Sequence, residues 1–309
     1  MPEPQLVLPI ADMGQLTALK VEKVIMGVDI YAGTLTRYYS RNWTRVKPHK
    51  LNHAAASDAA APVSEEEQEK KNMVSEEILD AIIRWQGELK GSLSSSYDGN
   101  FERWYEDYER DFFSSWLYWD EISALVITAA CKATGREVPQ KIPVGVNYMA
   151  HEAVVDCNER YSQMWSLMSG VTVWLPFASK AVFKAQMPDD HMATLSTVEA
   201  LYSELERIND LIWRADETEV EQWASQSPEL PDCVINESHP GHCQSSTDSG
   251  DNEVTAAEDA ARSSEQDSSE ECAAPELCNT DELARHAFAV LWQAAKFARD
   301  NSMPLRFHF

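Results

Sequence analysis

The hydrophobic pattern near the N-terminus predicts a buried strand. Residues 24–31 read VIMGVDIY, and four of these eight residues are β-branched. A β-branched run without strict alternation is typical of a strand that is buried on both faces. We expect a turn at residues 32–34, and the alternating pattern of residues 34–39 (TLTRYY) predicts a second, half-exposed strand.

Apolar residues recur at spacings of three and four in several later segments, which predicts helices. The predicted helices cover residues 78–89, 120–134, 198–212 and 283–298. The last segment is apolar on nearly every side, so we expect it at the centre of the fold. Ser196 and Glu199 form the S-x-x-E pattern of a capping box at the start of the third helix, and Thr280 is a candidate N-cap for the fourth.

Shorter segments predict the remaining elements. The β-branched and aromatic runs at residues 171–176 (VTVWLP) and 181–188 (AVFKAQMP) predict strands, and the final PLRFHF also suits one. Residues 150–169 are compatible with one helix, and a short helix is expected at residues 219–224.

Residues 92–118 interleave aromatic and acidic side chains, and several of the aromatic residues recur at helical spacing. Two interpretations stay open. The segment is a helix that packs an aromatic stripe on the core, or it presents an aromatic–acidic surface to a basic partner. The binding residues of the second interpretation are Tyr97, Phe101, Trp104, Tyr105 and Tyr108.

A long polar segment lies before the last predicted helix. Residues 229–279 consist largely of Ser, Asp, Glu and Ala, with almost no large apolar side chains. Such a segment cannot offset the entropy lost on ordering, so we predict a disordered acidic loop. The predicted organisation is a loosely attached extension at residues 1–23 and a single domain built from residues 24–228 and 280–309.

The charge of the chain narrows the classes of partner. The net charge is −25, and residues 237–282 contribute −12 of it, with 13 acids and one base. An acidic surface repels phosphate, which argues against nucleic acid as a direct ligand and suits a basic protein. The chain shows no signal peptide and no apolar run of the roughly 20 residues that cross a bilayer, so we expect no membrane contact and a cytoplasmic location.

Three carboxylates are candidates for a site without a linear motif. Asp29 interrupts an apolar strand, where a carboxylate is costly unless it is paired. It therefore lies at a strand end, caps a backbone group or meets a cation such as Arg37, or it is a site carboxylate with a raised pKa. Glu152 and Asp156 would share one face of a helix, which is either an ordinary exposed face or, with Asp29, a catalytic site that a divalent metal assists.

Four zinc-competent residues fall within one polar segment of the chain. They are Cys233, His239, His242 and Cys243, in a C-x5-H-x2-H-C arrangement. This spacing matches no common zinc finger, so we expect no metal there. The chain also lacks a phosphate loop, a dinucleotide fingerprint and a nucleophile elbow, so no cofactor is predicted.

These observations favour one fold class and one function. The expected fold is α+β, a mainly helical single domain packed on a small β-sheet. The expected function is a non-enzymatic cytoplasmic protein-binding module of the immunity or antitoxin type, whose partner is a basic protein such as a toxin or effector. The alternative is an enzyme that uses Asp29, Glu152 and Asp156. The sequence leaves the oligomeric state open.

Overall fold

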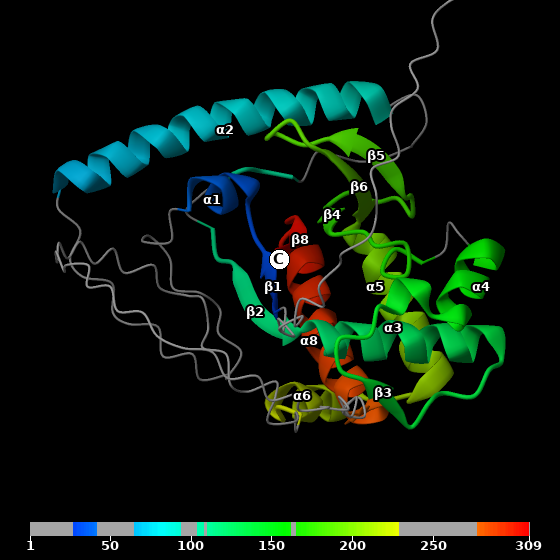
Figure 1. Ribbon diagram of the computed structural model, residues 1–309. Coiled ribbons are helices and arrows are strands. Elements are labelled where there is room, and N and C mark those ends of the chain that lie inside the picture. The colour runs from blue at the N-terminus through cyan, green and yellow to red at the C-terminus, as the bar shows by residue number, and fades with distance from the viewer. Residues whose placement is uncertain are drawn as a thin grey trace, which may run out of the picture.

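The fold combines helices with a mixed sheet (Figure 1). A computed structural model describes residues 27–41, 65–93, 104–107, 110–161, 165–228 and 277–308. These residues form seven α-helices, a six-stranded mixed sheet and a two-stranded sheet. The α+β class is therefore confirmed, with a larger sheet than the sequence indicates.

The main sheet has the strand order β2-β1-β8-β4-β6-β5. Its strands are β1 (Gly27–Ala32), β2 (Phe113–Tyr118), β4 (Val173–Leu175), β5 (Phe183–Gln186), β6 (Met192–Thr197) and β8 (Leu305–His308). Strands β4 and β6 pair in parallel, and the other neighbours are antiparallel. Because β8 lies between β1 and β4, the last strand of the chain joins the two halves of the sheet. The smaller sheet pairs β3 (Lys141–Pro143) with β7 (Leu277–Asn279).

The helices divide between the two faces of the main sheet. They are α1 (Leu35–Ser40), α2 (Glu65–Leu93), α3 (Trp119–Thr134), α4 (Glu152–Tyr161), α5 (Val198–Ile212), α6 (Glu217–Ser225) and α8 (Thr280–Asp300), and a 3-10 turn η1 (Tyr148–Ala150) precedes α4. Figure 1 shows α2 across one side of the molecule, with α3, α4, α5, α6 and α8 gathered on the other.

The larger core lies between the sheet and α3 and α8, on what we call the back face. Val28 and Ile30 of β1 share this core with Leu125 of α3 and Phe288 of α8. Twelve residues of α8 are buried, which confirms the central position expected from its apolar sequence. Many of them are alanines, whose small side chains let α3 and α8 approach each other and the sheet closely.

A smaller core lies on the opposite, front face. Ile82, Trp85 and Leu89 of α2 share it with Val173 of β4 and Leu195 of β6. These α2 residues lie at the spacing of three and four that the sequence analysis identified, so one stripe of the helix is buried. The core covers the front of β4, β5 and β6, and the front of β2, β1 and β8 carries a different set of side chains.

The prediction of a strand at residues 34–39 is wrong, because these residues form α1. The helix depends on two caps. The Thr34 hydroxyl accepts a hydrogen bond from the Arg37 backbone N–H at 3.4 Å. The carboxylate of Glu106 accepts one from the Thr36 backbone N–H at 2.8 Å. Glu106 lies far along the chain, so local alternation could not reveal this helix.

The predicted aromatic helix is also absent among the described residues of that segment. Residues 104–107 have no regular secondary structure, and their side chains alternate between buried (Trp104, Glu106) and exposed (Tyr105, Asp107). Residues 113–118 form β2, which the sequence analysis did not predict, and β6 was missed as well. Residues 104–107 therefore show burial with the two-residue period of an extended chain in place of the expected helical period.

Several predicted boundaries shift. Helix α4 ends at Tyr161, the N-cap of α5 is Thr197, and the N-cap of α8 is Asn279. Residues 277–279, at the end of the predicted disordered loop, form β7, and Cys278 is buried. The extension at residues 1–23 and residues 229–276 of the loop lie outside the described residues. No helix in the described part of the chain is long and apolar enough to cross a membrane.

Candidate functional site

The two faces of β1 differ sharply in character. On the back face, Val28 and Ile30 are fully buried. On the front face, the register places Asp29 directly between Trp116 of β2 and His308 of β8. Such cross-strand neighbours point to the same face, with Cβ atoms about 5 Å apart. Asp29 and His308 are exposed and Trp116 is partly buried, so this row is open to solvent.

Gly27 allows the indole of Trp116 to lie against the backbone of β1. A Cβ atom on Gly27 would lie 2.1 Å from Nε1 of Trp116, closer than any real contact. The ring of Trp116 also meets that of Tyr118, with the two centroids 4.1 Å apart in an edge-to-face arrangement. Asp29 is thus bordered on one side by two packed aromatic rings.

The other side of Asp29 is bordered by residues of β8 and α1. The Tyr38 hydroxyl and Nδ1 of His308 form a hydrogen bond of 2.8 Å. The guanidinium of Arg306 lies 4.1 Å from the centre of the Tyr38 ring and donates a hydrogen bond of 2.9 Å to the Tyr39 hydroxyl. Burial raises the pKa of Tyr38 and raises the pKa of Tyr39 to about 12, so both phenols are neutral near pH 7.

We call Asp29, Tyr38, Trp116, Tyr118 and His308 together the front surface. Its members come from three neighbouring strands and one short helix, and each strand is held by backbone pairing. The surface combines one exposed carboxylate with three aromatic rings and an imidazole. Such a set can bind a cation by charge and by contact with ring faces.

Arg37, the cation considered for Asp29, lies in the core. Its side chain is fully buried, and its guanidinium lies 4.9 Å from the centre of the Phe112 ring. Burial lowers the pKa of Arg37, and the charges of Tyr31, Asp111 and Asp107 oppose that shift. Arg37 therefore belongs to the packing of α1, whereas Asp29 belongs to the surface.

Of the five aromatic residues predicted to bind a partner, two lie in the described residues. Trp104 is a core residue. Its Nε1 donates a hydrogen bond of 2.8 Å to Glu106, and its ring centre lies 5.8 Å from that of Trp85 of α2. Tyr105 is 65% exposed, as a binding residue should be. Tyr97, Phe101 and Tyr108 lie outside the described residues.

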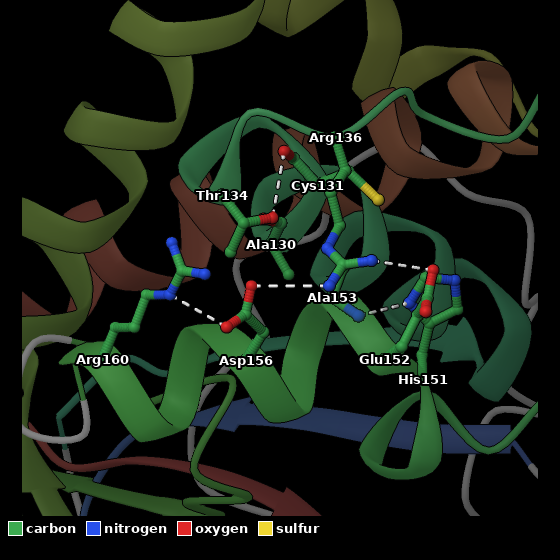
Figure 2. A network of polar contacts seen from close by, with 9 residues as sticks. All are labelled: Ala130, Cys131, Thr134, Arg136, His151, Glu152, Ala153, Asp156 and Arg160. Carbon is green, nitrogen blue, oxygen red and sulfur yellow. Dashed lines mark hydrogen bonds and ion pairs between the residues drawn. The ribbon is translucent and has the colours of Figure 1, made fainter.

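The helix carboxylates of the alternative catalytic site are held in ion pairs. Figure 2 shows Arg136, just after the end of α3, reaching toward both of them on α4. Arg136 lies 2.9 Å from Glu152 and 3.5 Å from Asp156, and Arg160 lies 2.9 Å from Asp156. The cluster joins the end of α3 to α4, which is a structural use of both carboxylates.

The structure does not bring Asp29 together with Glu152 and Asp156. Helix α4 packs into the back core, whereas Asp29 alternates along β1 with the back-facing Val28 and Ile30 and so points to the front. The sheet therefore separates Asp29 from Glu152 and Asp156. Within the described ranges, no group of three or more His, Cys, Asp and Glu residues is placed to hold a metal ion. The candidate zinc ligands Cys233, His239, His242 and Cys243 lie outside these ranges.

Sequence reasoning selected Asp29 but missed its neighbours. The sequence pattern places Trp116 and Tyr118 in a candidate helix, and nothing in it singles out His308. Residues 113–118 (FSSWLY) carry only a weak strand signal, because they do not alternate strictly; in the structure Phe113 and Leu117 are buried and the residues between them are less so. No family model, no curated protein and no solved structure is similar to this chain.

Proposed function

We propose that the protein is a non-enzymatic, cytoplasmic binding module of the immunity or antitoxin type, and that its front surface binds a basic protein. The observation that carries the proposal is the exposed carboxylate of Asp29 in a central strand, with Trp116 and His308 as its direct neighbours. A lysine or arginine of the partner can pair with this carboxylate and contact the aromatic rings at the same time.

The rigidity of the front surface supports this role. Its strand residues are fixed by pairing on both sides of β1, and Tyr38 is fixed by its hydrogen bond with His308. Preorganised aromatic side chains lose little conformational entropy on binding, which is why tryptophan and tyrosine are frequent binding hot spots. The net charge of −25 adds long-range attraction for a basic protein and speeds its association.

The proposed interface differs from the one expected from the sequence. Trp104 is buried in the core. We therefore propose Trp116 and Tyr38, in place of residues 97–108, as the main aromatic side chains that contact the partner. Tyr105 is exposed and is available as an additional contact. The buried cysteines Cys131 and Cys157 are free thiols, which suits a reducing compartment.

Affinity capture from cells of the source organism tests the proposal. The full chain is used as bait beside a double variant, Asp29→Asn with Trp116→Ala. We expect a stoichiometric protein partner with a basic isoelectric point that is retained by the natural chain and lost by the double variant. The proposal fails if no stoichiometric partner is captured, or if the double variant captures the same partner equally well.

Calorimetry with the purified partner then measures the contribution of each anchor. Trp116→Ala should weaken binding by about 30-fold or more, the range of a hot-spot tryptophan. Met192→Ala is the matched control, because Met192 is a 65% exposed apolar residue at the opposite end of the same sheet. Its removal should leave the affinity unchanged. If Trp116→Ala and Met192→Ala bind the partner with the same affinity, the partner does not use the front surface.

A further inference from the structure

A second site lies away from the front surface, beside α5. A cavity of about 310 Å³ opens between this helix, the turn at Ser166, the residues just before β5 and the end of β6. The volume is at the lower end of the range for small-molecule sites. Four of its lining residues, at positions 200, 203, 204 and 207, follow the spacing of a single face of α5.

The lining contains two basic side chains, Lys180 and Arg207, in a chain with a net charge of −25. Both side chains are exposed. Within the part of the chain that the structure describes, the Lys180 ammonium and the Ser203 hydroxyl have no hydrogen-bond or ion-pair partner. Two donors are therefore available to a bound molecule.

The one carboxylate in the lining is already occupied. Glu204 is buried and accepts hydrogen bonds from the Ser166 hydroxyl at 2.6 Å, the Ser166 backbone N–H at 2.7 Å and the Leu167 backbone N–H at 3.1 Å. Its lone pairs are thus directed at the turn rather than at Lys180. The carboxylate therefore fixes the wall of the cavity and leaves the Lys180 ammonium for a ligand.

The rest of the wall is held just as firmly. The Ser166 hydroxyl accepts a hydrogen bond of 2.9 Å from Nε1 of the buried Trp174. The Ser196 hydroxyl donates one of 2.9 Å to the carbonyl of Ala181, which ties the segment that carries Lys180 to β6. Sites for small molecules need such fixed walls, because a preformed cavity does not lose binding free energy to ordering.

We propose that this cavity binds a small anion that carries a phosphate or carboxylate group. Lys180 and Arg207 supply the charge, and Ser203 supplies a neutral donor. This site is independent of the proposed protein-binding function, because its residues come from other elements.

Isothermal titration calorimetry of the full chain tests the proposal. The probes are inorganic phosphate, glucose 6-phosphate and citrate, each at matched ionic strength so that general screening is constant. We expect one of the probes to bind with 1:1 stoichiometry and a Kd below about 1 mM, a modest affinity for charge-assisted hydrogen bonds. Binding of the phosphates alone assigns a phosphate ligand, and binding of citrate alone assigns a carboxylate.

Variants then locate the binding. The double variant Lys180→Met with Arg207→Met should weaken binding at least about 10-fold, because two charge-assisted contacts are lost. Lys184→Met is the control, since Lys184 is an exposed lysine on β5 that does not line the cavity. This variant should bind the probe with the affinity of the natural chain. Thermal melts without ligand verify that each variant is folded. The proposal is overturned if no probe binds below about 10 mM, or if the double variant binds like the natural chain.

Discussion

Asp29 and Glu204 illustrate two ways in which this fold accommodates a carboxylate. Asp29 lies in a strand that reads as apolar, yet the pleat turns it to the exposed front face, where water solvates it. Glu204 is buried, and three donors from the turn at Ser166 and Leu167 take the place of water. The first carboxylate lies on the proposed binding surface, whereas the second is committed to holding the structure.

Burial gives Glu204 a pH dependence that can be measured. It raises the pKa of Glu204 to about 7 from an ordinary value of 4.5, although hydrogen bonds from Ser166 and Leu167 oppose the shift. Between these two pH values the folded state holds a proton that the unfolded state releases. The contribution of this group to stability is therefore complete below pH 4.5 and is lost as the pH rises through 7, by about 3 kcal/mol.

The variant Glu204→Gln removes this titration. Chemical denaturation measures the unfolding free energy of the natural chain and of the variant from pH 4.5 to pH 8. Over this range the natural chain should lose about 3 kcal/mol of stability relative to Glu204→Gln. Glu206→Gln is the control, because Glu206 is exposed on the same helix. Its difference from the natural chain should stay constant. Parallel curves for the natural chain and Glu204→Gln would contradict the raised pKa.

Helices α3 and α8 form the central pair of the fold, and a buried hydrogen bond lies between them. Nδ1 of His286 on α8 meets Oε1 of Glu121 on α3. The other carboxylate oxygen of Glu121 accepts a hydrogen bond of 2.6 Å from the Tyr118 backbone N–H. Because the Glu121 side chain is 1% exposed, these partners rather than water satisfy its carboxyl oxygens. The pair therefore ties α8 to the junction of β2 and α3.

Removal of His286 should destabilise the protein strongly. His286→Ala leaves the buried Glu121 carboxyl group beside a cavity and without one hydrogen-bond partner, and we expect a loss of about 3 kcal/mol in the free energy of unfolding. Urea denaturation at pH 7 measures it. Lys296→Ala is the matched control on the same helix, because Lys296 forms an exposed ion pair with Glu217, and it should cost less than about 1 kcal/mol. Similar small losses in both variants would mean that the buried pair carries little of the stability.

The predictable elements are those whose buried side is marked by the apolar positions in their own sequence. Helices α3 and α5 have an apolar face that the sequence shows directly, and α8 is apolar on nearly every side. Strands β4, β5 and β8 lie in short segments with β-branched or aromatic residues. Helix α1 was missed because its cap, Glu106, comes from a distant segment. Strand β2 was missed because its aromatic residues fit both a helical and a strand period.

The candidate site was predictable only in part for a related reason. The cost of a carboxylate in an apolar strand identified Asp29 from the sequence alone. Its neighbours Trp116 and His308 reach it through the pairing of β1 with β2 and β8. Strand order in a mixed sheet depends on how the helices cover it, and no local spacing encodes that order. Tyr38 was missed because it lies on the unpredicted helix α1.

At the scale of the whole molecule, charge and structure are unevenly distributed. Residues 237–282 carry −12 of the net charge of −25. Helix α6, before this stretch, and β7, near its end, are fixed by other contacts. Helix α6 buries Val220 and Ala224, and β7 pairs with β3. Asn279 then caps α8 by accepting a hydrogen bond of 3.2 Å from the Asp281 backbone N–H. Contacts among the described residues thus hold both ends of the acidic segment.

We therefore predict that residues 231–274 are dispensable for stability. A flexible glycine–serine linker of about 20 residues, with a mean span of roughly 25 Å, replaces them. Halving a loop changes its closure free energy by only about 0.6 kcal/mol, so the melting temperature should change by less than about 3 °C. Circular dichroism melts measure the change. A drop of more than about 10 °C would show that the acidic segment packs on the fold.

A longer deletion sharpens this test, because it removes a described element. Extending the deletion through Asn279 eliminates β7, the buried side chain of Cys278 and the N-cap of α8. Loss of an N-cap alone costs about 1 kcal/mol, and exposing the surface beneath Cys278 adds to it. The longer deletion should thus melt several degrees below the shorter one. If the two deletions melt together, β7 contributes nothing, and the boundary of the folded domain lies at α8 rather than at Leu277.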